Sequence, residues 1–339
     1  MTKALIVTAT IIIIIAGIKS AEELVVPFLL AAFLATIAST PVFWLHRAKV
    51  PIGIAIFAIV LILVGIMMGV GAVVAHSATE FTVQLPYYEE RVTGLVSALF
   101  KTLESYGLAI SPEIFNPAIA LSFAGDTLLG FGRVLSSTFL ILLTVIFILA
   151  EAASFPRKLG EVLPNPEHNL PHFVRFTKTV NQYMAIKTSV SVATGIIITI
   201  FLSIIGVDFP VLWGLLAFML NYVPTIGSVF ASVPAILLAA LQLGPATAGI
   251  VAAGYLALNI GMGNIVEPRF MGRELGLSTL IVFLSLVFWG WMLGPIGMLL
   301  SVPLTMTAKI ALETRPTTAW IGYLLGPAKN PSDKESLEV

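Results

Sequence analysis

The chain has 339 residues, of which 58% are hydrophobic and only 11% are charged, and its formal net charge is zero. A soluble globular domain carries about 25% charged residues, so this composition indicates a membrane protein, and zero net charge argues against a nucleic-acid partner. The absence of cysteine excludes disulfides and cysteine metal sites. With only four scattered histidines, we expect no metal site and no cofactor.

Charge-free runs recur along the chain, and a transmembrane helix needs about 20 apolar residues. The runs are 4–18, 24–45, 50–75, 134–150, 188–207, 209–266 and 275–308. The first is short enough to resemble a signal-peptide core. However, Lys19, Glu22 and Glu23 follow it and a second run begins at once, so we expect a retained helix. Region 1–75 is therefore predicted to hold three transmembrane helices.

The segment 76–133 is predicted to lie outside the membrane as an extracytoplasmic amphipathic helical segment. Pro86 suits a helix start, and apolar residues follow it at helical spacing. Ser111-Pro112-Glu113 has the pattern of an N-cap, a first-turn proline and a favourable acidic residue. We interpret the segment as a folded spacer. The fourth transmembrane helix is expected at 134–150.

Basic residues in short loops indicate which side of the membrane each loop occupies. They cluster in the loop 46–49, in the region 151–187 and in the tail 313–339. With eight passes these segments all fall on one side, so we predict that both termini are cytoplasmic and that the membrane is the cytoplasmic (inner) membrane. Region 151–185 is predicted to be a cytoplasmic loop and a helix that continues into the fifth pass.

Region 186–312 is predicted to form the C-terminal transmembrane core. The run 209–266 is too long for one crossing, so we divide it into a broken helix at 209–241 and a second helix at 245–266. This gives about eight passes if 275–308 crosses once, and a re-entrant hairpin there is the alternative. The predicted fold class is all-α: a polytopic transmembrane helical protein with broken or re-entrant helices in its C-terminal third.

A polar helix break is expected at 221–228. Pro224 cannot donate a backbone hydrogen bond, and Gly227 adds flexibility three residues later. Carbonyl groups freed at such a break face a cavity in broken transporter helices. Asn221, Tyr222, Thr225 and Ser228 supply polar side chains beside it. The pattern suits a neutral polyol or a partly dehydrated sodium ion. The alternative is a kinked helix in which Asn221 satisfies its own backbone.

Glu267-Pro268-Arg269 lies between long apolar segments, where charges are costly unless they pair, face a cavity or lie at an interface. Pro268 disfavours helix at Glu267, so we expect a turn, with Arg269 or Arg273 as the partner of Glu267. Such a carboxylate can exchange a proton for sodium. The alternative is an interfacial loop that holds two helices in register. Asn259 and Asn264 lie on the approach to this turn.

Three further features carry weaker expectations. Asp208 is an alternative proton or sodium carboxylate, but its expected position at the outer interface favours a solvated loop residue. Thr188, Ser191 and Thr194 follow helical spacing, which predicts hydrogen bonds within packed helices or a polar path. Trp289 and Trp291 are interpreted as membrane-interface anchors.

Several sequence blocks in the last third are ordered and spaced in a recognisable way. They are Trp213-Gly214-Leu215-Leu216-Ala217-Phe218, Asn221–Ser228, Asn264–Arg273, Leu275-Gly276-Leu277-Ser278, Phe288–Gly297 and Ser301–Thr305. Together they closely resemble the AI-2E (autoinducer-2 exporter) family, also described as PerM-like permeases. Pro27-Phe28-Leu29-Leu30 and Pro41 fit the same family, so the resemblance covers nearly the whole chain.

The resemblance implies a secondary transporter that works as a homo-oligomer, with a pentamer as the first expectation. The expected function is export of a small polar solute such as autoinducer-2. The alternatives are a Na⁺(Li⁺)/H⁺ antiporter that uses an intramembrane carboxylate, and a passive pore or membrane scaffold. The sequence has no phosphate-binding loop and no hydrolase motif, so we expect neither direct use of ATP nor an enzyme. The candidate path residues are Asp208, Asn221, Tyr222, Pro224, Thr225, Gly227, Ser228, Asn264, Glu267, Arg269 and Arg273.

Overall fold

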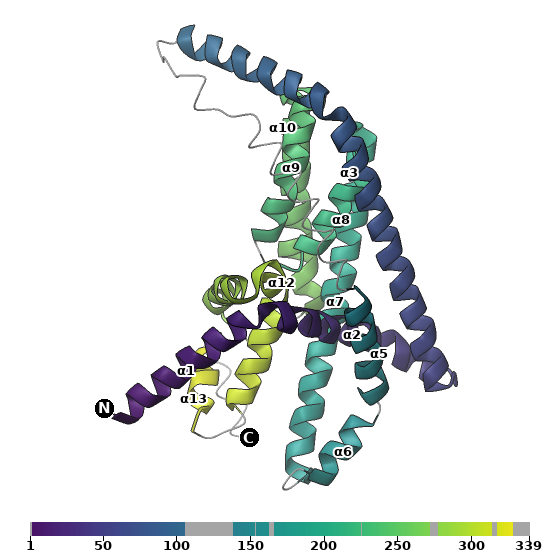
Figure 1. The fold of residues 1–339 in the computed structure, drawn as a ribbon, viewed down its shortest axis with the longest axis vertical. Helices are drawn as coiled ribbons and strands as arrows, with labels where there is room; N and C mark the ends of the chain where they lie inside the picture. The colour runs from purple at the N-terminus through teal and green to yellow at the C-terminus, as the bar shows by residue number, and fades with distance from the viewer. Residues whose placement is uncertain are drawn as a thin grey trace.

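The computed structural model describes residues 2–105, 138–152, 154–162, 166–224, 226–271, 277–313 and 317–327. All regular elements within these ranges are helices (Figure 1). Helices dominate because a bilayer offers no water to satisfy exposed backbone groups. Six of the described helices are long and apolar enough to cross a membrane, and α5 and α8 are shorter apolar helices. The predicted all-α polytopic fold is confirmed.

The N-terminal helices meet at a short turn. Helix α1 (Thr2–Ser20) is followed after Ala21 by α2 (Glu22–Arg47), and α2 packs against α3 and α5 around a core of small and branched apolar residues. Small residues in the middle of α2, such as Ala31 and Ala35, are fully buried and allow the helices to approach closely.

Helix α3 (Ile52–Ser105) runs without interruption from the third predicted pass into the predicted extracytoplasmic segment. The expected helix start at Pro86 is therefore wrong, because Pro86 lies inside α3. A proline inside a helix removes one backbone hydrogen bond and kinks the helix, and α3 bends along its length (Figure 1). The predicted N-cap at Ser111-Pro112-Glu113 lies outside the described residues.

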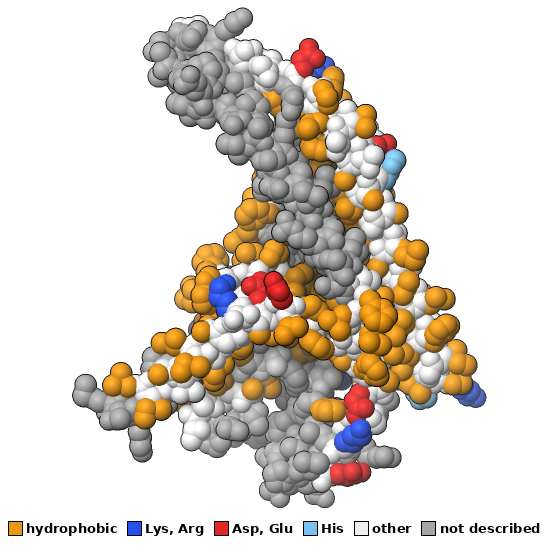
Figure 2. Space-filling model, viewed as in Figure 1, with side chains coloured by type: hydrophobic (Ala, Val, Ile, Leu, Met, Phe, Trp, Pro, Cys, Tyr) orange, Lys and Arg blue, Asp and Glu red, His pale blue; other side chains and the backbone are white. Residues whose placement is uncertain are grey.

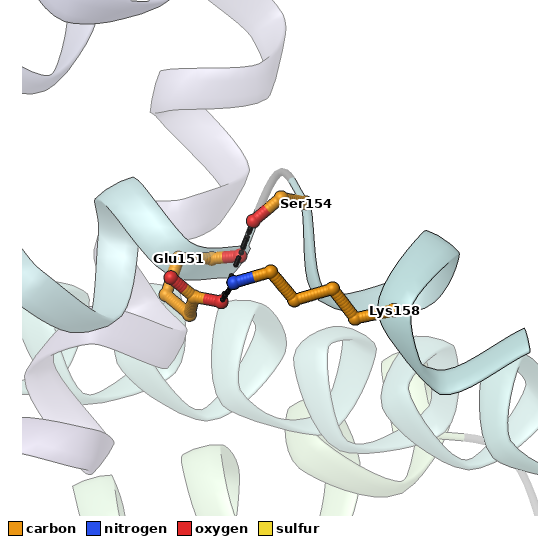
Figure 3. Close-up of polar contacts among 3 residues, drawn as sticks. All are labelled: Glu151, Ser154 and Lys158. Carbon is orange, nitrogen blue, oxygen red and sulfur yellow. Dashed lines mark hydrogen bonds and ion pairs between the residues drawn. The ribbon is translucent and has the colours of Figure 1, made fainter. Parts of the chain in front are cut away.

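Helices α5 (Thr138–Ala152) and α6 (Phe155–Val162) lead to α7 (Pro166–Ile205). The long helix expected ahead of the fifth pass is confirmed in α7. At the turn between α5 and α6, Lys158 Nζ donates a hydrogen bond to Glu151 Oε1 at 2.6 Å, and Ser154 Oγ donates to the Glu151 carbonyl at 3.1 Å (Figure 3). The hydrogen bond from Lys158 lowers the pKa of this exposed carboxyl below its ordinary value.

The run 209–241 differs from the single broken crossing that the sequence predicted. Helix α8 (Pro210–Leu220) and helix α9 (Ile226–Leu243) pack against each other as a hairpin. The Gln242 amide donates to Asp208 Oδ1 at 3.0 Å, and the Asp208 backbone N–H donates to Gln242 Oε1 at 2.9 Å. The hairpin therefore begins and ends at the same end of the bundle, with its tip at residues 221–224.

Close helix packing fixes this hairpin on α7. A Cβ added at Gly195 would lie 2.8 Å from the Gly214 carbonyl oxygen, and one added at Gly214 would lie 2.6 Å from the Gly195 carbonyl oxygen. Both positions lack room for a side chain, so glycine lets the backbones of α7 and α8 approach closely. The tip of the hairpin is thereby held against the first half of the membrane-crossing part of α7.

Helix α10 (Pro245–Asn259) returns from the Asp208 end and continues as a π-helix, η2 (Ile260–Val266), into the short helix α11 (Glu267–Met271). Helix α12 (Thr279–Glu313) is bent sharply at Leu293 and Gly294, where the backbone leaves helical geometry. Helix α13 (Ala319–Leu324) packs against α12. Both ends of the described chain lie in the lower half of Figure 1, towards α6.

The bend in α12 corresponds to the re-entrant alternative better than to a straight crossing. Trp289 Nε1 donates to Thr305 Oγ1 at 2.9 Å, although 16 residues separate them. In one straight helix these residues would be about 24 Å apart along the axis. The predicted anchor role of Trp289 is therefore wrong, since its N–H is used inside the bend. Trp291 is 57% exposed, as an anchor requires.

Hydrophobic side chains cover most of the described surface visible in Figure 2, and charged side chains form only a few small groups. A water-soluble protein does not expose apolar surface on this scale. The membrane-spanning helices and this surface together make the chain a multi-pass membrane protein in contact with a lipid bilayer.

Candidate functional site

Several predicted path residues meet at one polar cavity of about 350 Å³. Three elements surround it: the middle of α7, the tip of the α8–α9 hairpin, and the end of α10 with its π-helix. The lining residues are Lys187, Asn221, Val223, Pro224, Ser228, Asn259, Ile260, Gly263, Asn264 and Glu267. The volume falls within the range of about 300–1,000 Å³ that is usual for small-molecule sites.

An ion pair joins two walls of the cavity. Lys187 Nζ on α7 lies 2.6 Å from Glu267 Oε1 at the start of α11, and the two side chains are 4% and 20% exposed. Among the described residues the partner of Glu267 is Lys187, so the prediction of Arg269 is wrong. Arg269 lies exposed on α11, and Arg273 lies outside the described residues.

Sequence reasoning missed Lys187 as a functional residue because it was counted among the basic residues of the cytoplasmic loop. One signal was available in the sequence. Lys187 lies one helical turn before Ser191 and directly before Thr188, so all three fall on adjoining positions of one helix. A lysine at the start of a polar stripe that continues into a membrane span is a candidate for a buried partner.

The tip of the hairpin is bound to α7 by side-chain hydrogen bonds. The Asn221 amide donates to Ser191 Oγ at 2.9 Å, and the Tyr222 hydroxyl donates to Thr188 Oγ1 at 2.8 Å. Tyr222 is buried, and its ring packs edge-on against Phe33 and Phe218. Tyr222 therefore positions the tip, whereas Asn221 both positions it and lines the cavity.

The predicted helix break lies where it was expected, and helix α8 ends at Leu220 just before it. Pro224 lines the cavity in the turn that follows α8, and Gly227 is buried against the carbonyl group of Leu220. A side chain at Gly227 would collide with that carbonyl, so glycine is required for the tight turn. Ser228 lines the cavity one residue later, and Thr225 lies outside the described residues.

The end of α10 and the π-helix η2 form the opposite wall, where Asn259 of α10 and Gly263 and Asn264 of η2 line the cavity. Single-turn π-helices occur frequently at functional sites. The expected turn at Glu267 is wrong in detail, because Glu267 has helical dihedrals and Pro268 lies in the first turn of α11. Pro268 has no N–H to donate to a carbonyl of the preceding π-helix. The irregular backbone is the π-helix η2, which ends directly before Glu267.

Asp208 does not join this cavity. It lies at the far end of α7, and the 18 residues from Lys187 to Ile205 correspond to about 27 Å of helix. Its carboxylate accepts hydrogen bonds from the Tyr88 hydroxyl and the Gln242 amide, and its carbonyl accepts one from Trp213 Nε1. Asp208 is a structural junction between α3, the turn after α7 and the end of α9.

Comparison with known proteins adds a family assignment to this geometry. The family model described as "AI-2E family transporter" matches residues 8–316. The AI-2 transport protein TqsA of Escherichia coli strain K12 is 41% identical over 327 residues, which covers 95% of each chain. A protein of Haemophilus influenzae with the name "Putative transport protein" is 41% identical over 332 residues, which covers 95% of each chain. YhhT of Escherichia coli, named in the same way, is 37% identical over 328 residues, or 96% of this chain and 94% of its own.

Proposed function

The chain belongs to the AI-2E family of transporters, and from this premise we propose that it exports a small polar solute such as autoinducer-2 across the cytoplasmic membrane. Its family and its relatives are transport proteins and not enzymes. The name of TqsA concerns that protein. We extend the substrate in that name to this chain because the lining of the cavity is polar and electrically balanced.

The observation that carries the proposal is the electrical balance of the cavity lining. Lys187 and Glu267 compensate each other at 2.6 Å, and the remaining polar lining consists of the neutral side chains of three asparagines and one serine. A neutral polyol gains hydrogen bonds from such a lining without meeting an unpaired charge. A charged solute would have to break the pair or remain unpaired itself, which is costly in a buried place.

The position of the cavity supports loading from the cytoplasm. The basic loop before α7 is expected on the cytoplasmic side, and Lys187 follows that loop along α7. Glu267 and the hairpin tip lie at the same level as Lys187. In this proposed orientation the cavity is nearer to the cytoplasmic face, and both termini lie in the cytoplasm.

Two irregular elements provide the means for the cavity to change shape. The hairpin tip is held to α7 by two side-chain hydrogen bonds, and the π-helix holds the other wall. We infer that solute hydroxyls exchange with the Asn221–Ser191 bond and that the tip shifts as they do. Export then follows from alternate opening of the cavity to each side of the membrane.

Na⁺(Li⁺)/H⁺ antiport is the second candidate function, and the buried ion pair is the observation that favours it. A carboxyl group that binds either a proton or a cation can move the two in opposite directions, and Lys187 would be the counter-ion of the carboxylate when neither is bound. In the structure Lys187 is the counter-ion of Glu267. The same residue therefore serves either function, and only transport measurements separate them.

The test uses purified protein in liposomes with labelled autoinducer-2 on one side. We expect saturable flux that falls at least tenfold in Asn264→Leu and is retained in Asn181→Leu, because Asn181 lines a different, mainly apolar cavity. A second set of liposomes carries an internal pH dye and receives sodium or lithium outside. No solute flux together with a cation-driven pH change that is lost in Glu267→Gln would establish antiport and overturn export.

We also propose that the chain works as a homo-oligomer, with a pentamer as the first expectation. The support is the outer face of α3, where Ile62 and Ile66 are exposed and a Cβ added at Gly65 or Gly69 would meet nothing within 4 Å. Such a face fits either lipid or a second copy of the chain. Light scattering of the purified protein in detergent decides between a single chain and an assembly.

A further inference from the structure

A second, much smaller void adjoins the polar cavity. Its volume is about 20 Å³, which is enough for one water molecule or one hydroxyl group. Its lining residues are Thr194, Ile198, Ala217, Asn221, Ser228, Ala231, Tyr255, Leu258, Asn259 and Met262. Asn221, Ser228 and Asn259 line both spaces, so the void lies directly beyond the wall of the cavity.

The void lies deeper in the bundle than the ion pair. Tyr255 lies one helical turn before Asn259 on α10, on the side of the Asp208 end. Thr194 lies about two turns beyond Lys187 on α7 in the same direction. Past these residues the lining is apolar, with Ile198, Ala217 and Ala231 buried. The void therefore lies between the polar cavity and an apolar part of the bundle, in the direction of the Asp208 end.

Tyr255 makes this void chemically distinctive. The side chain is 6% exposed, and its hydroxyl is the one buried side-chain polar atom without a hydrogen-bond partner in the described part of the chain. A buried hydroxyl without a partner is unfavourable by itself. A polar group bound in the void would supply the hydrogen bond that the Tyr255 hydroxyl lacks.

Two other polar side chains around the void, Thr194 and Asn221, already have partners and can still accept a hydrogen bond. Thr194 Oγ1 donates to the Val190 carbonyl at 2.9 Å, which leaves its oxygen lone pairs available as acceptors. The Asn221 amide nitrogen donates to Ser191, which leaves the Asn221 oxygen available. A group that both donates and accepts, as a hydroxyl does, matches this set.

We propose that this void is a hydroxyl-binding subsite, in which Tyr255 binds one terminal hydroxyl of the solute that occupies the larger cavity. The inference rests on the proposed export of a neutral polar solute and adds a specificity-determining residue to it. Its ligand class is an uncharged polyol. A carboxylate, an ammonium or a methyl group at the same end of the solute fits the subsite poorly, because it lacks either the neutral charge or the hydrogen-bonding capacity.

The experiment compares the parent protein with Tyr255→Phe in liposomes loaded with labelled autoinducer-2. Unlabelled erythritol and butane-2,3-diol serve as competitors, because erythritol carries terminal hydroxyl groups and butane-2,3-diol carries hydrogen atoms in their place, as methyl ends. We expect the parent to be inhibited more strongly by erythritol. In Tyr255→Phe we expect KM for autoinducer-2 to rise roughly three- to tenfold, the loss of about one neutral hydrogen bond, with kcat little changed and the preference for erythritol reduced by a similar factor.

Two controls keep the result interpretable. Tyr323→Phe removes a hydroxyl from a side chain that is 62% exposed and should leave KM and competition unchanged. Thermal unfolding of Tyr255→Phe shows whether the variant is folded. An unchanged KM and unchanged competition in folded Tyr255→Phe overturn the subsite while leaving export intact. A parent protein that moves no autoinducer-2 and binds neither competitor overturns the proposed function and the subsite together.

Discussion

The Tyr88 hydroxyl donates a hydrogen bond of 2.8 Å to Asp208 Oδ2, 120 residues further along the chain. Tyr88 is fully buried, and its ring stacks on Phe81, which also contacts Phe209. This bond fastens the extended part of α3 to the turn between α7 and α8. Asp208 thus acts in holding three elements together, and its carboxylate is occupied by neutral donors from α3 and α9.

Replacing Asp208 with alanine should lower stability and leave solute transport in place. The change removes the hydrogen bonds that the Tyr88 hydroxyl and the Gln242 amide donate to the carboxylate, while Gln84 Oε1 and the Gly206 carbonyl remain as their other acceptors. Each lost bond is worth about 0.5–1.5 kcal/mol. Thermal unfolding should show a clear loss in melting temperature. Flux per folded protein should stay within about twofold of the parent, because Asp208 lies about 27 Å along α7 from the cavity.

Tyr88→Phe is the matched variant, because it removes the same bond from the other side and keeps the ring packing. Both variants should therefore be destabilised. Loss of flux in Asp208→Asn at an unchanged melting temperature would instead assign Asp208 to the transport path.

Stability should depend on Lys187 and Glu267 as a pair. Lys187→Met or Glu267→Gln alone changes one member of a buried ion pair, and losses of this type are about 3–5 kcal/mol. The double variant removes both charges and should regain most of that loss. A double-mutant cycle on melting temperature and detergent resistance measures the coupling.

The same double variant separates structure from transport chemistry. If the pair only holds α7 against α11, the folded double variant exports the neutral solute as the parent does. If Glu267 couples cations to protons, the double variant folds but shows no cation-driven pH change. Additive single effects in the cycle would contradict a direct Lys187–Glu267 interaction in the working protein.

The bend in α12 should depend on Lys19. Its ammonium group donates a hydrogen bond of 2.5 Å to the Trp291 carbonyl and lies 4.8 Å from the centre of the Trp291 ring. Bending at Leu293 leaves carbonyls of the first half-helix without helical donors, and a cation at a helix C-terminus is stabilising. We expect Lys19→Met to lower the melting temperature, with Lys158→Met as an exposed control of much smaller effect.

The sequence predicted the composition of the site well because that site is built from local signals. Pro224 and Gly227 marked the hairpin tip, and the long charge-free run followed by Glu267 marked the end of α10. Asn221, Ser228 and Asn264 line the cavity as expected. Each of these residues differs from its apolar surroundings, and such differences are visible without a structure.

The pairing of distant elements was not predictable in the same way. Hydropathy alone does not show that residues 209–241 fold as a hairpin, because a broken crossing and a re-entrant hairpin have the same pattern of apolar residues. The Asp208–Gln242 contact decides between them. Lys187 was missed for a related reason: its partner is 80 residues away, and a basic residue at a membrane edge is usually an orientation signal.

The Glu151 carboxyl should titrate below its ordinary pKa of 4.5, because Lys158 donates a hydrogen bond to its charged form. A carboxyl with a lowered pKa in the folded state stabilises that state above the ordinary pKa, and the effect is lost as the pH falls through the folded value. The difference in melting temperature between the parent and Glu151→Gln should therefore be present at pH 7 and vanish at strongly acidic pH.

This contribution should be small and sensitive to salt, because both side chains are about half exposed and exposed ion pairs are weak. Melting curves at low and high salt test it. A difference that persists unchanged in high salt or grows at acidic pH would show that Glu151 acts through some other contact.

Close packing between α7 and α8 gives the sharpest prediction on stability. In Gly214→Ala the new methyl group would meet the Thr199 hydroxyl and the Gly195 carbonyl, and overpacking of this kind costs about 1–3 kcal/mol. Because α8 leads directly to the hairpin tip, the shift should also weaken the Asn221–Ser191 bond and lower solute flux.

Gly249→Ala is the matched control, since nothing lies within 4 Å of its added Cβ. Alanine in a helix interior is favoured over glycine by about 0.5–1 kcal/mol, so that variant should melt at an equal or higher temperature. Equal melting temperatures for the two variants would contradict the close approach of α7 and α8.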